Sequence, residues 1–307
     1  MPSAAEIIGT IETYLSTMPK DARVELGFFG GTFTGLPFAE QQRLLGLVKP
    51  YPFASIRLST RPDYIDERIV DMLAEGGVGT VELGVQSLDE EVLRAVHRGY
   101  GVEEVERAAR LVQSRGMEVG MQMMVGLPGD TPEKSLATAR RIVELGATNT
   151  RIYPTLVVKQ TLLATLYEQG RYHALTIDEA VRWTAPVLRL FEESGLTVLR
   201  VGLHPTEGFI SHADYLAGPF HVSFKELVMT EIFRQQFASL PEGVEMIYVN
   251  PSKRNAAIGY NARNLNLLRP HSPHLRILPD PSIEGYDFTF VTAPNSQSNY
   301  PSKSRKQ

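Results

Sequence analysis

The sequence predicts an α/β fold built on a parallel sheet, and three observations point to it. Apolar segments with strand character alternate with amphipathic helical segments at a spacing of roughly 25–35 residues. Polar or glycine-rich loops follow the strands. Of the 307 residues, 43% are hydrophobic, which is ample for a sizeable core. The alternation is typical of right-handed βαβ crossovers, and hence of a (βα) barrel or an open doubly wound sheet.

The first elements of the chain flank a glycine-rich loop. Ser3 followed by Glu6 resembles a capping box, which predicts a helix through Leu15. The nearly continuous apolar run over 24–29 predicts a buried strand, and a helical pattern follows over 37–48. The two glycines after the strand allow a sharp turn and the close approach of a ligand to the backbone. A tight turn without a ligand explains this segment equally well.

The alternation continues to residue 203. Gly116 is expected in the left-handed conformation after a helix, and Pro62 in the first turn of one. Strands are expected over 54–59, 78–85, 117–125, 148–153 and 196–203. Helices are expected over 62–75, 88–95, 102–115, 132–145, 161–169 and 177–194.

A small mixed α/β appendage is expected after the barrel, because the alternation weakens. Its expected parts are a helix over 224–238, a strand over 244–249, an Asn/Arg/Gly-rich loop over 250–264 and a strand over 285–292. The chain therefore divides into a barrel over 1–203, an appendage over 204–292 and a disordered tail over 293–307.

Composition excludes several classes of protein. The sequence has no cysteine, so it forms no disulfide and supplies no thiolate nucleophile or cluster ligand. No apolar run approaches the roughly 18–20 residues that cross a membrane, and the N-terminus lacks the pattern of a secretory signal. A cytoplasmic location without membrane contact is therefore expected.

The charge is distributed unevenly along the chain. The net charge is −4, but the sequence after Asn250 contains eight Lys or Arg and only three Asp or Glu. That basic end is a weak indication of RNA or phosphate binding, and a solvated tail explains it equally well.

Polar or glycine-rich groups follow five of the predicted strands. They are Gly30–Thr32, Ser59–Arg61, Gln86–Ser87, Gln122 with the loop 126–130, and Tyr153–Pro154. In a parallel barrel these groups converge on one face, where such folds build their sites. Each of these loop sequences is common in turns and does not by itself indicate a function. Their order and spacing along the chain are much more specific. His204, His212 and His221 do not have the spacing of metal ligands, and no metal-binding side chain is predicted.

Together these segments resemble the radical S-adenosylmethionine (radical SAM) superfamily. The resemblance is closest to bacterial relatives of the Elongator catalytic subunit and to oxygen-independent coproporphyrinogen oxidase-like proteins, over about residues 4–290. The matching segments are 30–35, 59–63, 82–87, 97–100, 122–132, 151–155 and 200–206. The fold implied is a partial parallel (βα) barrel of the TIM type that lacks its first strand, with the superfamily's C-terminal extension over 204–292.

The resemblance implies that S-adenosylmethionine lies across the barrel mouth. Gly30, Gly31 and Thr32 would lie beside its methionine amino group, whereas other matching residues would contact the nucleoside or the carboxylate. These others are Ser59, Gln86, Arg98 and Gln122. Arg98 could pair with the carboxylate in a bidentate fork, but a cation on a helix surface is an alternative. Gln86 and Gln122 could equally bond neighbouring loop amides. Coproporphyrinogen oxidase-like proteins carry carboxylates where this chain has Ser59 and Gln122. This difference weakens the inference that the chain shares their substrate.

One departure from the superfamily concerns its iron–sulfur cluster. Relatives ligate a [4Fe–4S] cluster through three cysteines in a C-x₃-C-x₂-C motif, and this chain has none. Either the sequence is a fragment or mis-started reading frame of a longer enzyme, or the protein is degenerate. The intact loops favour the fragment.

The resemblance implies a radical SAM enzyme that generates a 5′-deoxyadenosyl radical for hydrogen abstraction. Its implied substrate is tRNA, and its implied electron donor is a flavodoxin or ferredoxin. Because it contains no cysteine, the chain is expected to be inactive in radical chemistry. The alternative function is a cluster-free barrel that binds RNA or a protein partner.

Overall fold

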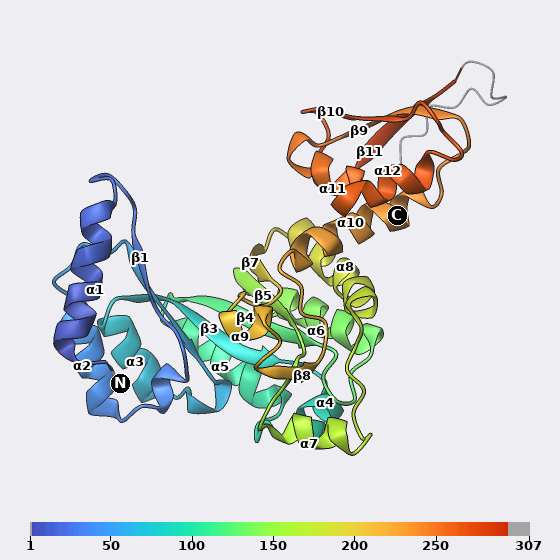
Figure 1. Ribbon diagram of the computed structural model, residues 1–307. Helices are drawn as coiled ribbons and strands as arrows, with labels where there is room; N and C mark the ends of the chain where they lie inside the picture. Colours follow the sequence, from blue (N-terminus) through green and yellow to red (C-terminus); the bar gives the residue numbers. More distant parts are fainter. Residues whose placement is uncertain (1, 294–307) are drawn as a thin grey trace. The chain divides into compact units, whose positions relative to one another are not determined.

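The computed structural model describes residues 2–293, and its main feature is a six-stranded sheet in the order β1-β2-β3-β4-β5-β7 (Figure 1). The strands are β1 (Glu25–Phe28), β2 (Ser55–Thr60), β3 (Val78–Gln86), β4 (Glu118–Val125), β5 (Asn149–Pro154) and β7 (Thr197–Val201). They run parallel and the sheet curls into a half-barrel. The α/β fold with a partial parallel barrel is therefore confirmed.

Helices connect these strands and build the C-terminal part. They are α1 (Ala4–Thr17), α2 (Phe38–Val48), α3 (Glu67–Glu75), α4 (Glu90–Ala95), α5 (Val102–Ser114), α6 (Pro132–Glu144), α7 (Leu162–Glu168), α8 (Ile177–Glu193), α9 (Glu207–Ile210), α10 (Phe224–Phe237), α11 (Arg254–Ile258) and α12 (Arg263–Leu268). The capping box predicted for Ser3 and Glu6 is present at the start of α1. Within residues 2–293, no helix is long and apolar enough to cross a membrane.

The chain forms two compact units, and each is described by itself. The first joins Met1–Met123 with Arg140–Arg151, and the second joins Met124–Ala139 with Ile152–Gln307. The predicted boundaries at 203 and 292 remain predictions. The predicted disordered tail lies almost wholly outside the described residues.

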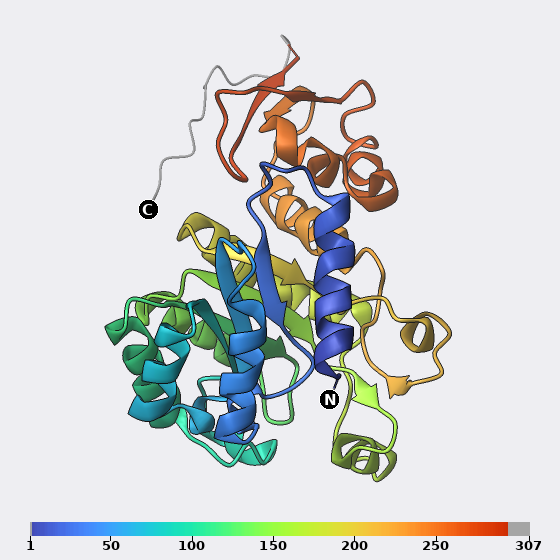
Figure 2. The ribbon, with the colours of Figure 1, turned by 90° about the vertical axis from the view of Figure 1, so that its left-hand side faces the viewer.

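In the first unit, the two faces of the sheet differ in chemistry. Leu58, Val81 and Leu83 are fully buried on the face that packs against α3 and α5. Figures 1 and 2 show these helices beside that face of the strands. Side chains alternate along a strand, so the neighbours of these residues, Arg57 and Glu82, point to the opposite face of the sheet. A polar face of the sheet therefore lies opposite its apolar core.

The strand predicted to be buried over 24–29 is only half-buried. Both ends of β1 are correct to within one residue, but Glu25 and Gly27 are exposed. The physical reason is position: β1 is the edge strand of the sheet, paired on one side with β2. An apolar run alone does not distinguish an edge strand from a central one.

Two other local predictions are wrong. Pro62 begins a short 3₁₀ turn (Pro62–Tyr64), and α3 starts later, where the Asp66 side chain accepts a hydrogen bond from the Ile69 amide. The segment 250–264, predicted as a loop, contains two 3₁₀ turns (Pro251–Lys253 and Tyr260–Ala262), α11 and the start of α12. Asn250 caps the first of these turns, and Gly259, with a φ of +92°, joins α11 to the second.

The second unit also contains two small sheets. β9 (Val244–Val249) pairs in parallel with β10 (Arg276–Pro279) and antiparallel with β11 (Phe288–Thr292). β6 (Val157–Val158) pairs antiparallel with β8 (Tyr215–Ala217). The predicted strand 285–292 is thus shorter than expected, and β6, β8 and β10 were not predicted.

Truncating the core of the first unit should destabilise it strongly. Leu83 is fully buried in the central strand β3, so we expect Leu83→Ala to lower the free energy of unfolding by about 2–5 kcal/mol, through lost burial and a residual cavity. Leu267→Ala is the control, because that side chain is 57% exposed. Urea denaturation would measure both, and equal losses would contradict the assigned core.

Candidate functional site

Three of the predicted cofactor-binding residues gather around Gly84, near the carboxyl end of β3. Gln86 follows it on the same strand, Gln122 is its register partner on β4, and the Nη2 atom of Arg98 donates to its carbonyl oxygen at 3.2 Å. Nε2 of Gln122 donates to Oε1 of Gln86 at 3.4 Å. The chain thus brings these three side chains together although they are far apart in sequence.

Arg98 lies in the turn between α4 and α5 and is not a cation on a helix surface. Its Nε donates to the Tyr100 hydroxyl at 2.9 Å, and that hydroxyl donates to the Gly84 carbonyl at 2.6 Å. Burial raises the pKa of Tyr100, and the neighbouring Arg98 guanidinium offsets part of that rise. The phenol therefore stays protonated and holds the guanidinium in a fixed position.

The glycine-rich loop after β1 has open space beside both of its glycines. Gly30 has φ of +106°, and a Cβ atom built on Gly30 or Gly31 would meet no atom within 4 Å. The loop is anchored to the neighbouring strand, because the Thr34 and Thr60 hydroxyls lie 2.5 Å apart. It lines a cavity of about 510 Å³ together with Phe28, Phe29 and Phe33.

Ser59 lies one strand away from the three gathered residues. Its register partner on β3 is Glu82, and its side chain is half-buried on the polar face of the sheet. No hydrogen bond joins Ser59 or the Gly30–Thr32 backbone to Gln86, Arg98 or Gln122 within residues 2–293. The predicted residues thus form a row along the ends of β1 to β4, with a contact network only at Gly84.

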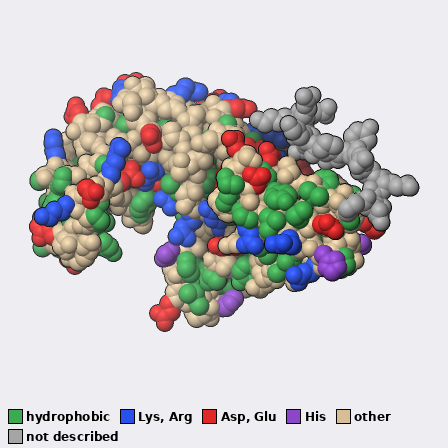
Figure 3. Space-filling model, turned by 90° about the horizontal axis from the view of Figure 1, so that it is seen from above, with side chains coloured by type: hydrophobic (Ala, Val, Ile, Leu, Met, Phe, Trp, Pro, Cys, Tyr) green, Lys and Arg blue, Asp and Glu red, His purple; other side chains and the backbone are tan. Residues whose placement is uncertain are grey.

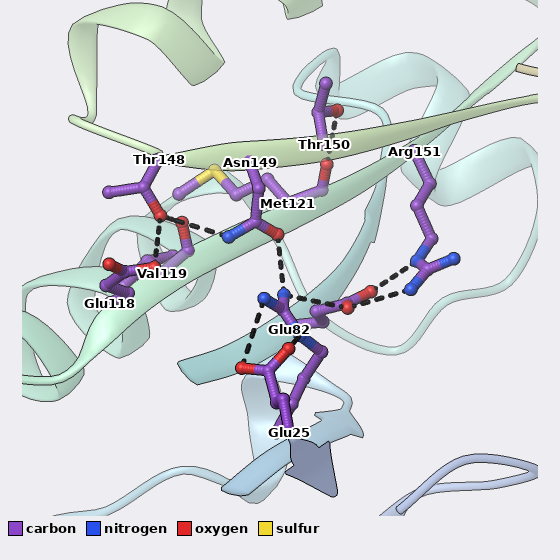
Figure 4. Close-up of polar contacts among 10 residues, drawn as sticks. Glu25, Glu82, Glu118, Val119, Met121, Thr148, Asn149, Thr150 and Arg151 are labelled. Atoms are coloured by element: carbon purple, nitrogen blue, oxygen red, sulfur yellow. Dashed lines mark hydrogen bonds and ion pairs between the residues drawn. The ribbon is translucent and has the colours of Figure 1, made fainter. Parts of the chain in front are cut away.

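A charged cluster crosses the polar face below this row (Figure 4). Nε and Nη2 of Arg151 donate to both carboxylate oxygens of Glu82, at 2.6 and 3.1 Å. Nη1 of Arg57 donates to Glu82 and to Asn149, at 3.1 Å each, while its Nε donates to Glu25 at 2.9 Å. The Glu82 side chain is only 5% exposed, so its charge is compensated almost entirely by the two arginines.

Two glycines make room on this face. A Cβ atom on Gly120 would lie 2.4 Å from Oδ1 of Asn149 and 2.9 Å from Cγ of Glu82. A Cβ atom on Gly27 would lie 2.3 Å from the Phe29 ring. Close approach of a side chain therefore explains both glycines.

The charged cluster was not predicted from the sequence. Its signal was a single charged residue between apolar neighbours within a strand, as in Ile56-Arg57-Leu58 and Val81-Glu82-Leu83. Such a residue must face away from the apolar core and find a partner there. Only the curvature of the sheet identifies that partner.

Two basic side chains of the C-terminal segment, Lys253 and Arg254, are held by internal contacts. Lys253 pairs with Glu192 at 2.5 Å and lies 4.3 Å from the Tyr286 ring centroid. Nε of Arg254 donates to the Ile277 carbonyl at 3.0 Å. On the face drawn in Figure 3, acidic and basic side chains are interspersed. These contacts weaken the interpretation of the segment as a phosphate site.

Comparison with known proteins decides the family. Residues 5–142 match the model of the radical SAM superfamily, and residues 148–234 match that of the Radical_SAM C-terminal domain. The chain belongs to the radical SAM superfamily. The resemblance stated from the sequence is therefore confirmed.

Individual relatives are similar over part of their length. The chain is 33% identical to a tRNA uridine(34) acetyltransferase of Dehalococcoides mccartyi, over 43% of this chain and 30% of the relative. It is 30% identical to protein YhcC of Escherichia coli, over 48% of this chain and 53% of that protein. It is 30% identical to Elongator complex protein 3 of Saccharomyces cerevisiae, over 58% of this chain and 33% of that protein. The chain thus spans about a third to a half of these relatives.

A solved structure supports the fold. The archaeal Elp3 of Methanocaldococcus infernus, with an N-terminal deletion, superimposes with a TM-score of 0.64 at 22% identity. The superposition covers 76% of this chain and 58% of that one. This likeness shows that the two proteins share a fold.

Removing the charge of Glu82 should destabilise the first unit. In Glu82→Gln, the largely buried Arg151 loses its carboxylate partner and Arg57 keeps only Glu25, and breaking a buried pair costs about 3–5 kcal/mol. Glu193→Gln is the matched control, because its pair with Arg189 is exposed and is worth at most about 1 kcal/mol. The free energies of unfolding in urea should differ accordingly, and equal values would refute the assigned burial of the cluster.

Proposed function

We propose that this chain binds S-adenosylmethionine at the carboxyl ends of β1 to β4. The observation that carries the proposal is the gathering of Gln86, Arg98 and Gln122 at Gly84, on the edge where the open Gly30–Gly31 loop also ends. Ligands of parallel α/β folds bind at this edge of the sheet.

The residues present fit the cofactor. The bare backbone at Gly30 and Gly31 accepts a close approach, and its carbonyls suit an ammonium group. Nη1 of Arg98 and the hydroxyl of Ser59 make no hydrogen bond within the described residues. Arg98 would hold the carboxylate, while Ser59, Gln86 and Gln122 would hold the nucleoside. When bound, the cofactor would supply a sulfonium group that one-electron reduction can cleave.

The residues present do not fit the iron–sulfur cluster. Such clusters are held by cysteine thiolates, and the sequence contains no cysteine. No group of three or more His, Asp or Glu that could hold a metal gathers within residues 2–293. We therefore propose that this chain does not perform radical chemistry by itself.

Transfer RNA is the proposed substrate class. The support is similarity to a protein named tRNA uridine(34) acetyltransferase and to Elongator complex protein 3. The second candidate function is a cluster-free barrel that binds RNA or a protein partner. It is favoured by the missing cysteine ligands together with the retained strand-end residues.

Isothermal titration of the anaerobically purified chain tests cofactor binding. Each neutral hydrogen bond adds about 0.5–1.5 kcal/mol, against an association cost of at least several kcal/mol. The dissociation constant for S-adenosylmethionine is thus expected to be roughly millimolar and not micromolar. Arg98→Ala should weaken binding roughly tenfold, since it removes a charged hydrogen bond. Arg94→Ala, on the neighbouring α4, is the control.

Three outcomes bear on the proposal. Equal affinities of the wild type and Arg98→Ala, or no binding at high millimolar cofactor, would refute the assigned site. Stoichiometric iron, or production of 5′-deoxyadenosine, would refute the argument about the cluster. Micromolar binding without iron would show that the strand-end residues suffice by themselves.

A further inference from the structure

Phe29 is an exposed aromatic residue in an unusual setting. It follows β1 and precedes the Gly30–Gly31 loop, and 56% of its surface is exposed. Its ring folds back over Gly27, where any side chain would collide with it. Because β1 is the edge strand of the sheet, no neighbouring strand covers this ring, and it is accessible to a ligand.

Arg151 lies against this ring. Its Cζ atom is 5.2 Å from the centroid of the Phe29 ring. Glu82 accepts from both Nε and Nη2 of Arg151, and this two-point contact fixes the plane of the guanidinium. The guanidinium thus lies over one face of the ring, and the two groups form a short stack on the polar face of the sheet.

We propose that Phe29 and Arg151 form a stacking site for one unpaired nucleobase of a single-stranded RNA segment. Single-stranded RNA is recognised by stacking its splayed bases on aromatic rings and on guanidinium planes. Phe29 also lines the cavity of about 510 Å³ beside the Gly30–Thr32 loop, whose other walls include apolar side chains of α1 and α2, and this cavity has room for a base. The choice of RNA rests on the proposed function.

The charges of the site favour stacking over phosphate binding. Arg57 and Arg151 are offset by Glu25 and Glu82, so the cluster carries no net charge. A phosphate would find no excess of positive charge in this cluster, whereas a neutral base loses little by desolvation there. The site therefore selects the base over the backbone.

Binding of a fluorescently labelled hexauridylate, compared with a matched abasic hexamer, tests the proposal. Phe29→Ala should weaken hexauridylate binding about fivefold to a hundredfold, which is the range for stacking one base on an aromatic ring. Phe29→Trp should preserve binding, and Phe29→Leu should be intermediate because it keeps apolar bulk without a π face. None of these variants should change binding of the abasic hexamer.

Controls separate this inference from the proposed function. Tyr14→Ala removes an aromatic ring that is 62% exposed on α1 and should leave RNA binding unchanged. Titration with S-adenosylmethionine is repeated on each variant, since Phe29 is not among the residues assigned to that cofactor. Cofactor binding with no effect of Phe29 substitutions on RNA binding would overturn the stacking site alone. Base-dependent RNA binding through Phe29 without cofactor binding would overturn the proposed function alone. Failure of the wild type to distinguish hexauridylate from the abasic hexamer would also overturn the stacking site.

Discussion

The carboxylate of Glu82, held between Arg57 and Arg151, is the interaction on which the polar face of the sheet depends. Strands in a flat sheet lie about 4.8 Å apart, so β2 and β5 would be separated by about 14 Å. Nη1 of Arg57 nevertheless lies 3.1 Å from Oδ1 of Asn149 on β5. Such contacts form only because the sheet curls and its inward side chains converge. The curvature and the charged cluster therefore require each other, and Gly120 provides the space that both need.

The same constraint explains why the site divides into two layers. Towards the carboxyl ends of the strands, Gly84 is surrounded by Gln86, Arg98 and Gln122, which can exchange their hydrogen bonds for those of a ligand. One step along the strands, Glu82 and its arginines satisfy one another and are nearly buried. Buried charges with complete partners resist rearrangement. The charged layer is thus a rigid base for the more adaptable polar layer above it.

The sequence was sufficient to predict most strands of the barrel, because each is a short apolar run bounded by glycine or polar residues. It was insufficient where position in the sheet decides the outcome. The apolar composition of Val24–Phe29 predicts a buried strand, yet β1 is half-exposed. Its place at the edge of the sheet agrees with the predicted barrel that lacks its first strand, and composition alone does not show it. Arg98 could be assigned to a helix surface or to a ligand from sequence, but its bonds to Tyr100 and Gly84 depend on a turn that sequence does not specify. Pairings such as Glu82 with Arg151 join residues 69 positions apart and follow only from curvature.

The absence of cysteine and the retention of the strand-end residues have different physical consequences. Without thiolates the chain cannot hold an iron–sulfur cluster, so any radical chemistry would need ligands that this sequence does not contain. The Gly30–Gly31 backbone, the Gly84 network and the charged layer do not need the cluster for their geometry, since their contacts lie within the first unit. The cofactor binding that we propose therefore needs only the strand-end contacts, whereas radical chemistry also needs thiolates.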